Sequence, residues 1–124
     1  MFRILVADKL GPAGLRRLEE ESDVTVDVKT GLSKTELCSL IPAYDALLVR
    51  SSTQVDADLL SVAEKLRVIG RAGMGVDNID VAAATARGVL VMNTPGVNSI
   101  ATAEHTILLM LAAARHTAEA HQSV

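Results

Sequence analysis

The sequence has little of what several classes of protein need. Cys38 is the only cysteine, so no disulfide can form within the chain, and we expect a cytoplasmic location. Aromatic residues make up 2% of the chain and the net charge is -3, which leaves few rings to stack on bases and no broad basic surface. The longest uninterrupted apolar run, residues 107–114, is far below membrane-spanning length. We therefore expect neither a nucleic-acid partner nor a membrane partner.

What the sequence does contain is a regular alternation of short apolar runs and helical patterns. The apolar runs cover residues 4–7, 24–28, 46–49, 68–69 and 89–92. A helical stretch follows each run after a short connection, and no Pro- or Gly-rich linker divides the chain. This pattern predicts an α/β fold, namely a doubly wound parallel sheet of five strands with helices on both faces. A long helix from about Ile100 to His116 is expected to follow the sheet.

The order of the strands is suggested by the patterns of two runs. Residues 24–28 (VTVDV) alternate between apolar and polar side chains, as an edge strand does. Residues 46–49 (ALLV) are apolar without alternation, which is typical of a central parallel strand. We therefore predict the flavodoxin-like order 2-1-3-4-5.

The last helix is unusual because residues 107–114 are apolar on every side. A helix without a polar stripe is normally buried all round, and the end of a five-stranded domain offers only one side to pack against. We expect that a partner covers this helix or that the natural chain continues past Val124. Self-association through residues 107–111 is the specific prediction, and a homo-oligomer follows from it.

Small and basic residues gather where the predicted strands end. These segments are residues 8–9, 50–53, 71–75 and 93–99, and they include Arg50 and Arg71. Ligands of open α/β sheets bind beyond the carboxyl ends of the strands, so these segments should meet at one edge. Two arginines with many small hydrogen-bond donors predict a site for a small anion.

The segment GRAGMGVDN, residues 70–78, carries the clearest signal. Glycines at 73 and 75 are expected to let the backbone take unusual φ values and to leave no Cβ in the way of a ligand, while Arg71 adds bidentate hydrogen bonds. The simpler alternative is an ordinary glycine turn in which Arg71 bonds a nearby helix end. The segment is not a dinucleotide fingerprint, because Asn78 stands where G-x-G-x-x-G needs its third glycine.

Two long runs, LLVRSSTQVDADLL and LRVIGRAGMGVDNIDVAAATARGVLVMNTPGVNSIATAEHT, resemble the amino-terminal part of the D-2-hydroxyacid dehydrogenases. The resemblance implies that residues 1–97 form a flavodoxin-like substrate-binding lobe. It implies that residues 98–124 form the inter-domain helix and the start of a Rossmann lobe that binds NAD. The implied substrate is a small phosphorylated or carboxylate molecule.

The resemblance also implies roles for individual residues. The substrate-binding candidates are Arg50, Ser51, Arg71, Ala72, Gly73, Met74, Gly75 and Asn98. Met74 and Thr102 match positions that touch the nicotinamide end of NAD. Several relatives carry threonine at the position of Met74, so only its backbone and thioether are available here. No spacing of His, Cys and Asp suggests a metal site.

The family's catalytic arginine, acid and histidine, and its G-x-G-x-x-G, belong to the second lobe and are not found in these 124 residues. We therefore expect no catalytic residue here, and an inactive fragment of an NAD-dependent oxidoreductase. One alternative is a non-catalytic module that binds small anions. Another is a phospho-receiver domain, which would need an acidic cluster after the first strand and an aspartate after the third. This sequence has Asp8-Lys9 and Arg50 there.

Overall fold

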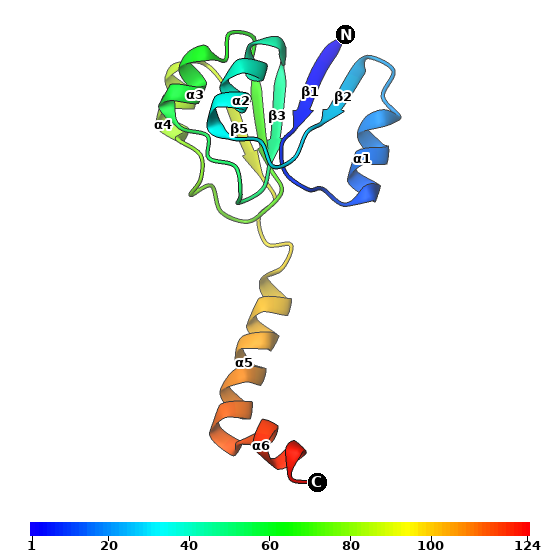
Figure 1. Ribbon diagram of the computed structural model, residues 1–124, viewed down its shortest axis with the longest axis vertical. Coiled ribbons are helices and arrows are strands. Elements are labelled where there is room, and N and C mark those ends of the chain that lie inside the picture. Colours follow the sequence, from blue (N-terminus) through cyan, green and yellow to red (C-terminus); the bar gives the residue numbers. More distant parts are fainter.

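A computed structural model describes all of residues 1–124 and contains one five-stranded sheet. Its strands are β1 (Phe2–Val6), β2 (Val24–Val28), β3 (Ala46–Val49), β4 (Val68–Arg71) and β5 (Leu90–Asn93). The order is β2-β1-β3-β4-β5 and every pair is parallel. The predicted α/β class and strand order are therefore confirmed, and β2 lies at an edge as its alternating sequence indicated (Figure 1).

Helices lie on both faces of the sheet, but unequally. The helical segments are α1 (Pro12–Glu19), α2 (Lys34–Leu40), the 3-10 turn η1 (Ile41–Ala43), α3 (Ala57–Val62), α4 (Val81–Ala86), α5 (Ser99–Arg115) and α6 (Thr117–Gln122). Helices α2, α3 and α4 cover one face, whereas α1 alone lies beside β2 on the other (Figure 1). The second face is consequently open in part, and Leu90 and Met92 of β5 are 57% and 55% exposed.

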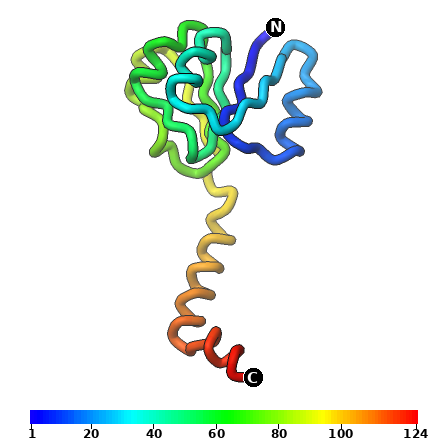
Figure 2. The backbone as a smooth tube through the Cα atoms, viewed as in Figure 1, coloured from blue at the N-terminus to red at the C-terminus, as the bar shows by residue number.

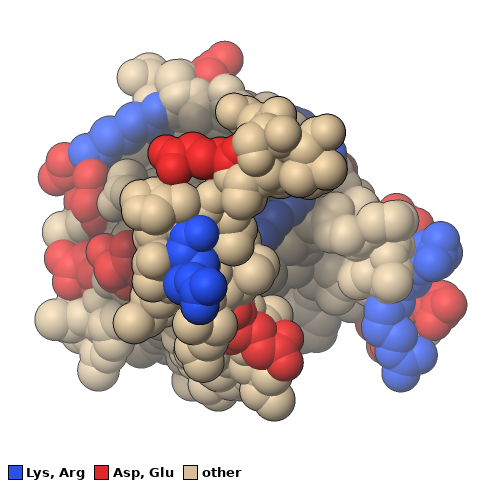
Figure 3. Space-filling view, turned by 90° about the horizontal axis from the view of Figure 1, so that it is seen from below, with Lys and Arg blue, Asp and Glu red and all other residues tan.

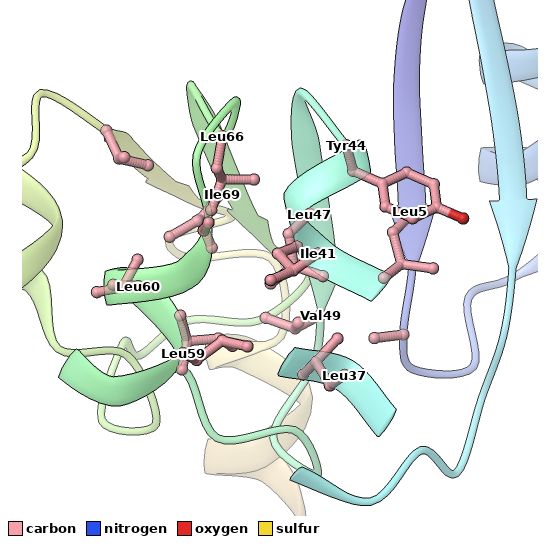
Figure 4. Packing of buried hydrophobic residues seen from close by; sticks show 14 of the residues in the cluster. Leu5, Leu37, Ile41, Tyr44, Leu47, Val49, Leu59, Leu60, Leu66 and Ile69 are labelled. Carbon is pink, nitrogen blue, oxygen red and sulfur yellow. The ribbon is translucent and has the colours of Figure 1, made fainter. Parts of the chain in front are cut away.

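The core lies between the sheet and helices α2 to α4. Alternate strand residues such as Leu5, Leu47 and Ile69 point to this side and are fully buried (Figure 4). They pack in one cluster with Leu37 and Leu59 of the helices. Each large apolar side chain buried in this way contributes about 1.5–3 kcal/mol. The core thus holds the central strands rigidly, and their carboxyl ends are placed by it.

The long helix α5 leaves the sheet domain instead of packing on it (Figures 1 and 2). The side chains of residues 107–111 are each more than half exposed, as was predicted for this apolar stretch. The helix begins at Ser99 and ends at Arg115, where His116 takes a left-handed conformation with φ of 49° and α6 changes direction. Neither α5 nor any other helix combines the length and hydropathy that crossing a bilayer requires.

The strand boundaries differ from the predicted ones in a way that affects the site. β4 does not end at Ile69 but continues through Gly70 and Arg71, because both residues pair with β3 and β5. Arg71 is paired with Val49 and with Asn93. It therefore starts from a strand with a fixed direction and not from a flexible loop.

Candidate functional site

A hollow with a volume of about 430 Å³ lies at the carboxyl ends of the strands. It is lined by Lys9, Leu10, Gly11, Arg50, Ala72, Gly73, Thr94, Val97 and Asn98. Four of the eight substrate-binding candidates, Arg50, Ala72, Gly73 and Asn98, therefore come together as the sequence indicated. The other four, Ser51, Arg71, Met74 and Gly75, are not part of this lining.

The loop of residues 50–53, which follows β3, is held in place by two buried polar side chains. The Asp8 carboxylate accepts hydrogen bonds from the Arg50 N–H at 2.6 Å, the Thr53 N–H at 3.2 Å and the Thr53 hydroxyl at 2.9 Å. Asn78 donates from its amide nitrogen to the carbonyls of Arg50 and Thr53, at 2.7 and 2.6 Å. The backbone is thus fixed from both sides, and the Arg50 side chain remains exposed to solvent.

These contacts assign roles that the sequence did not reveal. Asp8 and Asn78 are 6% and 4% exposed, the two buried polar residues of the protein. Asp8 is occupied in holding a loop and Arg50 follows β3, so the acidic constellation of a phospho-receiver is not formed. In the sequence, Asn78 was noted only as the residue that stands in place of the third glycine of the dinucleotide fingerprint. In the structure, its side chain holds the loop of residues 50–53 through two hydrogen bonds.

The Arg71 side chain is folded beneath the loop that follows it. Only 10% of this side chain is exposed; its Nη1 donates to the carbonyl of Gly75 at 2.6 Å, and its Nη2 lies 3.4 Å from Asp77 Oδ1. Its Nε is buried without a hydrogen-bond partner. The guanidinium therefore binds its own loop. This is closer to the alternative of an ordinary glycine turn than to a substrate-binding arginine. Its partner, however, is a loop carbonyl and not a helix end.

The two glycines of this loop are explained by that arginine. Positive φ values occur at Gly31, Gly88 and Gly96 and at neither Gly73 nor Gly75, so the predicted unusual φ values are wrong. A Cβ at Gly73 would lie 2.7 Å from Arg71 Nη1, and one at Gly75 would lie 3.0 Å from Asp77 Oδ1. The absence of a Cβ does matter, but it leaves space for the Arg71 guanidinium and the Asp77 carboxylate.

In the same loop, some backbone N–H groups are hydrogen-bonded within the protein and others are not. The Ala72 N–H is bonded to Val49 O and the Gly73 N–H to Arg71 O, each at 2.9 Å. The N–H groups of Met74 and Gly75 have no hydrogen-bond acceptor within the protein. Of the four residues predicted to receive a carboxylate, Met74 and Gly75 are therefore the ones with donors to offer.

The two cofactor candidates lie where the sheet domain joins α5. The Met74 sulfur is 3.7 Å from the Ser99 hydroxyl, and the Met74 carbonyl accepts from the Asn93 side chain at 2.6 Å. Thr102 lies three residues after Ser99 on α5, so the two residues share one side of the helix. Met74 and Thr102 are therefore placed near the same junction, outside the hollow.

Five lining residues of the hollow were not among the substrate-binding candidates. Lys9, Thr94 and Val97 belong to segments expected at this edge, whereas Leu10 and Gly11 lie outside those segments. Lys9 was expected at this edge because it follows the first predicted strand, but no ligand-binding role was given to its side chain. Basic and acidic side chains otherwise stand in small separate groups, with no continuous basic surface on the face seen in Figure 3. The hollow with its two cations suits a small anion.

Comparison with known proteins places the chain in a class. The family model described as "D-isomer specific 2-hydroxyacid dehydrogenase, catalytic domain" matches residues 4–124. The chain belongs to this family. Among the solved structures, a protein from Thermus thermophilus shares 38% identity with a TM-score of 0.84, over 94% of this chain and 38% of that one.

Similar proteins with a narrower name are D-3-phosphoglycerate dehydrogenases. The one from Methanocaldococcus jannaschii is 52% identical over 100% of this chain and 23% of its own length. The one from Archaeoglobus fulgidus is 49% identical over 99% of this chain and 23% of its own length. The crystal structure of NAD+-bound 3-phosphoglycerate dehydrogenase from Entamoeba histolytica matches with 31% identity and a TM-score of 0.78, over 90% of this chain and 38% of that one. The chain thus spans less than a quarter of the length of these curated relatives.

Proposed function

We propose that residues 1–97 are the substrate-binding lobe of an NAD-dependent D-3-phosphoglycerate dehydrogenase, which oxidises 3-phosphoglycerate to 3-phosphohydroxypyruvate in serine biosynthesis. Residues 98–124 are then the inter-domain helix and the start of the NAD-binding lobe. The observation that carries the proposal is the hollow beside the exposed Arg50, at the strand ends where this fold binds ligands. The names of the relatives at 46–52% identity support the choice of substrate.

In this proposal, the loops after β3 and β4 bind different groups of the substrate. The free N–H groups of Met74 and Gly75 receive the carboxylate, as backbone donors can when they are not used within the fold. Arg50 binds the phosphate, with Ser51 and Asn98 as neutral donors beside it. Arg71 contributes indirectly, because it shapes the loop that carries Met74 and Gly75.

NAD supplies the hydride acceptor when it is bound. The residues proposed to touch it are Met74, through its backbone or thioether, and Thr102, since both lie at the junction with α5. These 124 residues contain no G-x-G-x-x-G and none of the catalytic side chains expected of the second lobe. We therefore propose that this chain alone binds the substrate weakly and reduces no NAD.

A titration followed by two-dimensional amide NMR tests the proposal. Adding 3-phosphoglycerate to the chain should shift the amide signals of Arg50, Met74 and Gly75, whereas glycerol, which lacks both anionic groups, should shift none of them. No NADH should form above a no-enzyme control. Shifts confined to other parts of the sheet domain, or NADH formed by this chain alone, would contradict the proposal.

A non-catalytic module that binds small anions is the second candidate. It is favoured by one observation, namely that the hollow and its cations are complete within this chain. The same chain joined to the second lobe of a D-3-phosphoglycerate dehydrogenase separates the two functions. Recovery of NAD reduction supports the dehydrogenase lobe, and binding of 3-phosphoglycerate without any NAD reduction supports the module.

We also propose that the protein is a homo-oligomer that associates through α5. Leu108, Leu109 and Leu111 are 59%, 56% and 60% exposed on a helix that contacts little of its own domain. A neighbouring copy that buried the exposed part of two such leucines would gain roughly 2–4 kcal/mol. Sedimentation equilibrium should give a mass above the monomer, lowered by Leu109→Glu and unchanged by Thr117→Glu, which adds the same charge outside residues 107–111.

We also propose a cytoplasmic location, with which the half-buried, unpaired Cys38 is consistent.

A further inference from the structure

Two cations line the hollow, and only one of them was a substrate-binding candidate. They are Arg50 and Lys9, and both are exposed. Neither side chain takes part in an ion pair or a side-chain hydrogen bond in the structure, whereas Arg3, Lys34 and Arg71 all do. Lys9 and Arg50 are therefore free to bind a ligand anion without first giving up a carboxylate.

The backbones that carry these cations are tied together. Asp8, the residue before Lys9, accepts the Arg50 N–H at 2.6 Å. One residue earlier, the Ala7 N–H donates to Leu48 O at 2.9 Å, which continues the pairing of β1 with β3. The positions of residues 9 and 50 relative to one another are thus set by buried hydrogen bonds and not by flexible loops.

The same side of the hollow has a further favourable feature. Gly11 lines it and is the N-cap of α1, whose first turn contains no acidic residue and whose cap makes no side-chain hydrogen bond. The amino end of a helix carries a partial positive charge that favours anions. This contribution adds to that of the two side chains and does not depend on them.

We infer that Lys9 is the second cation of the anion site, in the role that the sequence suggested for Arg71. Lys9 and Arg50 together bind the phosphate group of the substrate, while the backbone N–H groups of the loop after β4 bind its carboxylate. This inference rests on the proposed function and makes Lys9 a residue that determines specificity for phosphorylated hydroxy acids. A phosphate monoester carries up to two negative charges on three oxygens, so a second cation favours it over a carboxylate.

The test compares two ligands that differ only in the phosphate. Dissociation constants of 3-phosphoglycerate and D-glycerate are measured by amide NMR titration on the 124-residue chain and its variants. Lys9→Met should weaken 3-phosphoglycerate binding about tenfold, the size of one charge-assisted hydrogen bond, and leave D-glycerate binding unchanged. Lys9→Arg should restore most of the affinity, because the cation is kept.

Lys29→Met is the matched control, since Lys29 follows β2 outside the hollow and should affect neither ligand. A Lys9→Met variant that binds 3-phosphoglycerate within about twofold of the original chain would overturn the inference, and so would an equal loss for both ligands. In either case binding by the original chain leaves the proposed function intact. If the original chain binds neither ligand, the proposed function and this inference fail together.

Discussion

The loops after β3 and β4 begin alike and are stabilised in opposite ways. Each starts with an arginine, Arg50 or Arg71, at the end of adjacent strands. The loop of residues 50–53 is held by side chains from elsewhere, Asp8 and Asn78, and its own arginine stays free in solvent. The loop of residues 71–78 is held by its own arginine, which is nine-tenths buried and bonded to Gly75. Of the two arginines, the one that remains available for a ligand is the one whose loop is held by other side chains.

Of the substitutions that test this difference between the two loops, removing Asp8 should have the largest effect on the free energy of unfolding. Asp8→Ala leaves two N–H groups and a hydroxyl of the loop of residues 50–53 without their acceptor in a partly buried place, so we expect a loss of about 1–3 kcal/mol of unfolding free energy. Urea unfolding followed by circular dichroism measures it. Glu64→Ala, at an exposed position, serves as the control. A loss no larger than that of the control would show that the loop does not depend on Asp8.

Exchanging the two arginines for methionine compares the loops directly. Arg71→Met removes the hydrogen bond to Gly75 O from a buried side chain and should cost about 1–3 kcal/mol. Arg50→Met changes an exposed side chain and should cost less than about 0.5 kcal/mol. Both values come from urea unfolding at neutral pH. Equal losses for the two variants would remove the difference proposed between the loops.

The space that Gly73 leaves for Arg71 predicts a smaller effect. Gly73→Ala places a Cβ where Arg71 Nη1 now lies, and the guanidinium must shift away from Gly75 O, at a cost of about 1 kcal/mol. In the Arg71→Met background the same substitution should cost clearly less, because the group that it displaces is gone. A double-mutant cycle of unfolding free energies measures this coupling, and additive losses would contradict the steric explanation.

The smallest effect concerns Asp56, which fixes the far end of the segment after β3 by capping α3. Hydrogen bonds from Lys34 and then from the Leu59 N–H lower the pKa of Asp56 below its ordinary value of 3.8. Its ionised form is therefore stabilised by folding, so the contribution is full above the ordinary pKa and declines as pH falls through the lowered one. Asp56→Ala should cost about 0.5–1 kcal/mol at pH 7.

The pH dependence of that loss checks its origin. The difference between Asp56→Ala and the original chain should shrink in strongly acidic solution. Asp58→Ala removes the other carboxylate that contacts Lys34, at an 82% exposed side chain without a capping role, and should cost little at any pH. A loss for Asp56→Ala that stays constant down to acid pH would contradict the contribution of the charge.

Much of the fold could be predicted because its signals are local. The alternating residues 24–28 marked β2 as an edge, and the uniformly apolar residues 46–49 marked β3 as central. The helix starts are equally local, because Asp56 and Asp80 cap α3 and α4 by accepting a hydrogen bond from a backbone N–H three residues later. The carboxyl end of β4 was misplaced because Gly70 and Arg71 have no strand preference of their own. They are strand residues only because β3 and β5 pair with them.

The sequence by itself determined the α/β class, the strand order and the edge of the sheet at which the candidate site lies, since hydrophobic periodicity and the parallel topology depend on patterns along the chain. Only the tertiary structure decided which residues at that edge face the hollow. Arg71 donates to the Gly75 carbonyl within its own loop, whereas Lys9 and Arg50 both line the hollow, with their backbones tied by the hydrogen bond from the Arg50 N–H to Asp8. These are contacts of single side chains. The one between Arg50 and Asp8 joins residues 42 positions apart, and such contacts cannot be predicted from a periodic pattern.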